Sequence, residues 1–146
     1  MEVHYLGDDT IQYGEVVCTP DSELLARDRL TVDVVDCLDA WHVYQGRALL
    51  YLPYRHLDDA ACTALCEQVS ATMEAADLSL SVAFLSIPST SNRYELLEVL
   101  RPRYVIPMYQ WTRHAQSAQL IEFARQVMLR HLGVPKVLQP HQFLAL

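Results

Sequence analysis

Residues 78–107 read LSLSVAFLSIPSTSNRYELLEVLRPRYVIP, and this stretch decides the fold. The largely apolar run Leu78–Ile87 is typical of a buried strand. Asn92, with a glutamate three residues later, predicts the N-cap of a helix that ends at Leu100. Residues 104–106 then read as a second short buried strand. A strand, a helix and a further strand in this order indicate an α/β domain.

The segment after this stretch predicts one long helix and a closing hairpin. Ser117–Leu132 has the spacing of an amphipathic helix, and Gly133 stands where the C′ position of a helix favours glycine. Residues 136–138 and 143–146 are expected to pair around a turn at 140–141. The helix residues expected to face the core are Leu120, Ile121, Ala124, Val127, Met128 and Leu132.

The segment before the stretch predicts a hairpin and a helix. Trp41–Gln45 and Ala48–Leu52 flank Gly46 and Arg47, as in a β-hairpin. Asp58 and Asp59 favour the positive end of a helix that follows. Its apolar stripe comprises Cys62, Leu65, Cys66, Val69, Met73 and Ala76.

The first third of the chain reads mostly as strands. They are expected at 2–6, 10–13, 15–18 and 30–38, with a short helical turn at 23–26. No repeat, low-complexity stretch or linker interrupts the chain, so residues 1–146 are expected to form a single domain.

Composition excludes several classes of function. The net charge is −7, and the single lysine and scattered arginines offer no track for phosphates, so nucleic acid is not an expected partner. No apolar run is long enough for a transmembrane helix, and the first residues do not resemble a signal peptide. A cytoplasmic protein that binds no membrane is therefore expected.

The four cysteines are Cys18, Cys37, Cys62 and Cys66. Without a secretory segment they are expected to be free thiols, mostly buried. Cys62 and Cys66 lie four residues apart, as two metal ligands on one helix face would. His56 is the only nearby third ligand, so no metal site is predicted here.

Several segments resemble the metallo-β-lactamase family, in particular its lactonase-like branch. They are residues 1–7 with Thr10 and Ile11, the segment 46–51, the segment 100–108 (LRPRYVIPM) and the ending 133–140. The resemblance is most specific over residues 78–146. It implies an αββα sandwich, here truncated, with mixed sheets and the helices on the outside.

The family's metal ligands are missing from this chain. Its His-x-His-x-Asp-His motif does not occur, and the stretch that would hold it is absent between Asp21 and Leu30. By the resemblance, Arg55 falls near the bridging aspartate, and Tyr109 replaces the last metal-binding histidine. A zinc ion needs three or four converging donors, and a permanent cation repels it. We therefore expect no metal and no cofactor.

Two sets of residues near the former active site remain candidates. His56, Tyr109 and His114 are the candidates for a rebuilt catalytic site. Tyr54, Arg55, Tyr109 and Trp111 are the candidates for ligand or partner binding, with a loop that packs back onto the core as the alternative for the aromatic pair. His42, and Ser89 or Ser91 after the buried strand, are further possible participants.

The shortened chain favours a role in assembly. A sandwich that keeps both ends of the family's length but loses its middle leaves a sheet edge or face uncovered. The prediction is a non-catalytic binding or assembly subunit, a pseudoenzyme that forms a homo-oligomer or joins a larger protein complex. The alternative is a small hydrolase, or a small-molecule sensor, with a metal-free site at the old cleft.

Overall fold

The strands form two sheets. The computed structural model describes residues 2–19, 41–44, 47–53, 58–109 and 116–146; the turn expected at 23–26 and the strand expected at 30–38 lie outside these ranges. One sheet is antiparallel, with the order β3 (Val16–Cys18), β2 (Thr10–Tyr13), β1 (Glu2–Gly7) and β9 (Phe143–Ala145). The other has the order β4 (Trp41–Tyr44), β5 (Arg47–Leu52), β6 (Leu80–Ser86), β7 (Tyr104–Met108) and β8 (Val134–Pro135).

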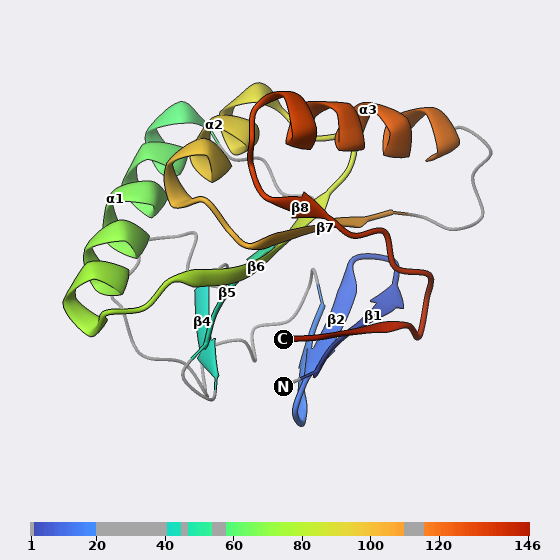
Figure 1. Cartoon of the computed structure of the whole chain (residues 1–146), viewed down its shortest axis with the longest axis horizontal. Helices are drawn as coiled ribbons and strands as arrows, with labels where there is room; N and C mark the ends of the chain where they lie inside the picture. Colours follow the sequence, from blue (N-terminus) through green and yellow to red (C-terminus); the bar gives the residue numbers. More distant parts are fainter. Residues whose placement is uncertain (1, 20–40, 45–46, 54–57, 110–115) are drawn as a thin grey trace.

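The five-stranded sheet is the middle layer of the molecule. Strands β4 and β5 form the predicted antiparallel hairpin, and β5 to β8 run parallel. Figure 1 shows helices α1 (Asp59–Ala76), α2 (Ser91–Leu100) and α3 (Gln116–Leu129) over one face and the four-stranded sheet on the other side. Strand β6 is covered on both faces, and for this reason nearly all its residues are buried.

The predicted class, a mixed α/β fold, is confirmed by these layers. The αββα sandwich would place helices on both outer sides. In the described residues, helices cover only the outer face of the five-stranded sheet. Within the same residues, no helix is both long and apolar enough to cross a membrane.

Helix α1 begins at Asp58 and Asp59, the acidic residues that predicted its start. The side chain of Asp58 accepts a hydrogen bond from the Ala61 backbone N–H at 2.7 Å, and Asp59 lies in the first turn. Cys62, Leu65 and Val69 are buried, with Cys66 and Met73 packed against the core. Ala76, which was also predicted on the apolar stripe, is exposed in the last turn of α1.

The N-cap predicted for α2 is wrong. Thr90 is the N-cap residue, and Asn92 lies inside the first turn. The Asn92 amide donates to the Asp59 carboxylate at 3.2 Å, so its side chain joins two helices instead of capping one. Asp59 lies far from Asn92 in the sequence, so a capping pattern based on neighbouring residues cannot predict this hydrogen bond.

The end of α3 also differs from the prediction. His131, with φ of 53°, is the left-handed C′ residue, and Leu132 N–H donates to the Val127 carbonyl at 3.0 Å in a Schellman motif. Gly133 is needed for another reason. A β-carbon at this position would lie 2.4 Å from the backbone oxygen of Pro102.

The closing hairpin is wrong as well, because the last two strands belong to different sheets. Strand β8 lies at 134–135, ahead of the expected 136–138, and pairs in parallel with β7. Strand β9 pairs antiparallel with β1, with Val3 opposite Leu144. The intervening turn, with His141 at φ of 70°, carries the chain from one sheet to the other.

We expect Gly133→Ala to lower the free energy of unfolding by roughly 2–4 kcal/mol, since both the clash with Pro102 and the φ of 142° oppose a side chain. Urea unfolding followed by circular dichroism measures this. Gly14→Ala is the matched control: its φ of 58° is also left-handed and costs only about 1–2 kcal/mol. Equal losses in the two variants would contradict the close approach at Gly133.

Candidate functional site

The carboxyl ends of the parallel strands meet at one edge of the five-stranded sheet. Leu52 of β5 pairs with Leu85 of β6, and Ser86 pairs with Met108 of β7. In open α/β sheets this edge is the usual place for a ligand. The segments that follow β5 and β7 hold most of the predicted site residues. Tyr54, Arg55, His56, Trp111 and His114 lie outside the described residues, and their roles stay predictions.

A turn from the other sheet reaches this edge. Gly7, Asp8 and Asp9, between β1 and β2, all have positive φ (92°, 50° and 59°). The Asp9 carboxylate accepts a hydrogen bond from the Ser86 hydroxyl at 2.8 Å, and the Tyr51 hydroxyl donates to the Asp9 carbonyl. From the sequence, residues 7–9 were predicted only as the connection between the strands at 2–6 and 10–13. The two consecutive aspartates after a glycine were the available signal for a functional or strained loop.

Tyr5 and Tyr109 fill the space between the sheets at this edge. The Tyr5 hydroxyl donates to the Tyr109 carbonyl at 2.6 Å and accepts from the Tyr109 N–H at 2.8 Å. The Tyr109 hydroxyl donates to the Leu138 carbonyl at 2.7 Å. Burial raises the pKa of both phenols, so neither loses its proton near neutral pH.

Tyr109 was a candidate for both catalysis and binding, and only 3% of it is exposed. Its contacts favour the alternative, in which this aromatic residue packs back onto the core.

We expect Tyr5→Phe to destabilise the chain by about 1–3 kcal/mol, because the buried N–H and carbonyl of Tyr109 each lose a hydrogen bond. Tyr104→Phe is the control, because the hydroxyl of the half-buried Tyr104 forms no hydrogen bond with the described residues. The phenylalanine ring keeps the cation–π contact with the Arg103 guanidinium. Differential scanning calorimetry compares the two. An unchanged melting temperature for Tyr5→Phe would show that this contact holds nothing together.

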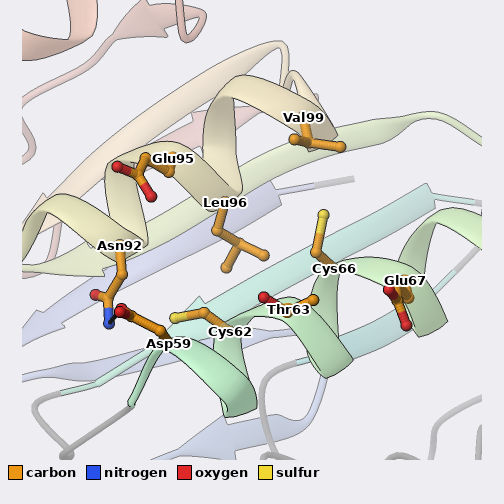
Figure 2. Close-up of a pocket in the computed structure, with 9 residues that line it drawn as sticks. All are labelled: Asp59, Cys62, Thr63, Cys66, Glu67, Asn92, Glu95, Leu96 and Val99. Carbon is orange, nitrogen blue, oxygen red and sulfur yellow. Dashed lines mark hydrogen bonds between the residues drawn. The ribbon is translucent and has the colours of Figure 1, made fainter.

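A groove of about 380 Å³ separates α1 from α2 (Figure 2). Figure 2 shows Cys62, Cys66 and Asp59 on α1 facing Asn92 and Leu96 of α2. Burial, with the Glu67 charge as a lesser cause, raises the pKa of the Cys66 thiol, which makes it a poor nucleophile and metal ligand at neutral pH. Within the described residues, no three His, Cys, Asp or Glu side chains are placed to hold a metal.

The outer face of α3 is the most apolar exposed surface on the three helices. Ile121 is 70% exposed, and Met128 and Leu129 are each 65% exposed. Ile121 and Met128 were predicted to face the core, and this is wrong: the inward positions are occupied by Phe123 and Val127, with Leu120 partly buried.

An ion pair lies in the middle of this apolar face. The Arg125 guanidinium donates two hydrogen bonds to the Glu122 carboxylate, both at 2.9 Å. Hydrogen bonds from Arg125 and Gln126 lower the pKa of Glu122 to about 2, so the carboxylate stays ionised throughout the physiological range. The pair therefore stays ionised and adds no net charge to the face.

The structure also describes the further possible participants. Ser91 begins α2, and His42 lies in β4. Ser89 follows β6 and lines a second cavity, discussed below.

Comparison with known proteins adds no identification. No family model matches this chain, and no curated protein matches it either.

Proposed function

We propose that this protein is a non-catalytic assembly subunit that pairs with a second copy of itself through the outer face of α3. The observation that carries this proposal is the exposure of Ile121, Met128 and Leu129 on one side of a helix whose opposite side already packs on the sheet. Single exposed apolar residues are ordinary, but three on one helix face around a paired charge are typical of an interface.

The spacing on α3 favours a symmetric partner. Ile121 and Leu129 are each four residues from Arg125, and Glu122 and Met128 are each three residues from it. If two copies of α3 cross antiparallel near Arg125, Ile121 of one copy lies opposite Leu129 of the other, and the same contact repeats across the two-fold axis. Because Arg125 is held by its own Glu122, the two guanidinium groups meet at the axis with their charge already compensated.

The contacts at the strand edge support a role without catalysis. Asp9, Ser86, Tyr5 and Tyr109 carry the reactive groups described there, and each is engaged in holding the sheets together. A general base or nucleophile must instead reach the substrate with a suitable pKa. The degenerate metallo-β-lactamase-like scaffold is part of this proposal, supported by two stacked sheets with helices outside one of them. Action in the cytoplasm is also part of it.

The test is sedimentation equilibrium over a range of protein concentrations. A single short helix pair buries less area than a standard interface, so we expect a concentration-dependent dimer. Ile121→Glu should give a monomer at every concentration, because each copy would place a carboxylate opposite an apolar residue. Val99→Glu is the matched control: Val99 is 63% exposed on α2, away from the proposed interface, and this variant should still dimerise.

Two outcomes would reject the proposal. A wild-type chain that is monomeric at all concentrations excludes self-association, and equal dissociation of the Ile121 and Val99 variants places the interface elsewhere.

A further inference from the structure

A second cavity, of about 370 Å³, lies beyond the end of β6 on the helix side of the sheet. The loop between β6 and α2 forms one wall through Ile87, Pro88 and Ser89, and α3 forms the other through Gln119 and Phe123. Its volume lies in the range of small-molecule sites. It borders the outer face of α3 that the proposed dimer uses, because Glu122 lines the cavity and also holds Arg125 in that face.

Two of the wall residues carry buried oxygen atoms without a hydrogen-bond partner. They are the Ser89 hydroxyl and the Gln119 side-chain carbonyl, and within the described residues neither has a donor or acceptor in reach. A buried polar group without a partner costs about 1–3 kcal/mol. Two residues with such atoms line one cavity, and an incoming molecule that satisfies both oxygens would remove this cost. Because both oxygens are shielded from solvent, the site requires a rotation of the Ser89 or Gln119 side chain to bring each oxygen into contact with a ligand.

The charged groups around the cavity are already paired. Glu122 holds Arg125, while Arg130 donates to Glu98 at 3.2 Å and to Gln126 at 2.9 Å. A charged ligand would enter without a free counter-charge and would lose hydration at considerable cost. The chemistry of the cavity therefore favours a neutral molecule.

From these features we propose that this cavity binds a neutral carboxamide attached to an apolar body. Gln119 presents an acceptor, and the Ser89 hydroxyl both accepts and donates. A carboxamide matches this pair, because its –NH₂ donates to Gln119 and its carbonyl accepts from Ser89. The apolar body packs against Ile87, Pro88 and Phe123.

The experiment is a titration of the isotope-labelled full chain with benzamide, followed by two-dimensional proton–nitrogen NMR. Benzoate is the matched control ligand, because it has the same ring but a charged group without donors. We expect saturable shifts at 87, 89–91 and 118–126 with benzamide and none with benzoate. The absence of saturable shifts, or equal shifts with the two ligands, would overturn the proposal.

Two variants and one control test the contacts themselves. Gln119→Leu and Ser89→Ala should each weaken benzamide binding about tenfold, the effect of one lost hydrogen bond of ordinary strength. Gln68→Leu removes another buried, unpartnered carbonyl, on α1 and outside the cavity, and should leave binding unchanged. The same spectra report whether each variant is folded. Unchanged affinity in folded Gln119→Leu, or equal weakening in Gln68→Leu, would show that the cavity is not the site.

Discussion

Tyr5 is the residue through which the two sheets and the chain's last segment are joined. Its backbone N–H donates to the Gln142 carbonyl, and its carbonyl accepts from the His141 N–H. Its hydroxyl bonds both the N–H and the carbonyl of Tyr109, at the end of β7. One buried residue therefore links the first strand, the turn before the last strand and the end of the strand that follows the α2 helix. Because each of these groups would be costly to bury alone, the three segments are fixed together.

The same kind of contact occupies the sheet edge at which the parallel strands end. The Tyr5–Tyr109 contact, the Tyr109–Leu138 contact and the Asp9–Ser86 contact occupy the polar groups at the described part of that edge. In a working hydrolase such groups face the substrate, and the sheets are held by packing. Here they stabilise the fold, and the two surfaces proposed to bind partners lie on the helix layer. Those surfaces are the apolar outer face of α3 and the cavity beside Ser89.

The sequence predicted the elements well where the signal is local. The acidic start of α1, the hairpin before residue 53 and the buried strand after residue 78 each follow from neighbouring residues. It failed where a distant partner decides the outcome. The last two strands looked like a hairpin because nothing local reveals that one pairs with β7 and the other with β1. Asp9 and Ser86, which are 77 positions apart, were missed at the site for the same reason.

Helix α3 shows a different limit of pattern reading, which bears on function. It has more apolar residues than one core-facing stripe needs. The helical spacing of these residues is therefore compatible with more than one face turned toward the core. Phe123 and Val127 occupy the interior, and this choice leaves Ile121, Met128 and Leu129 outside. The same helix carries Gln119 and Phe123 toward the cavity. Binding on one flank would influence pairing on the other only if the helix had two positions with different affinities. The Schellman motif at His131 and the bond from Val134 to Arg103 hold the carboxyl end of α3 against the sheet. A helix anchored in this way is expected to keep one position, so coupling between the two surfaces is expected to pass through Glu122, the residue they share.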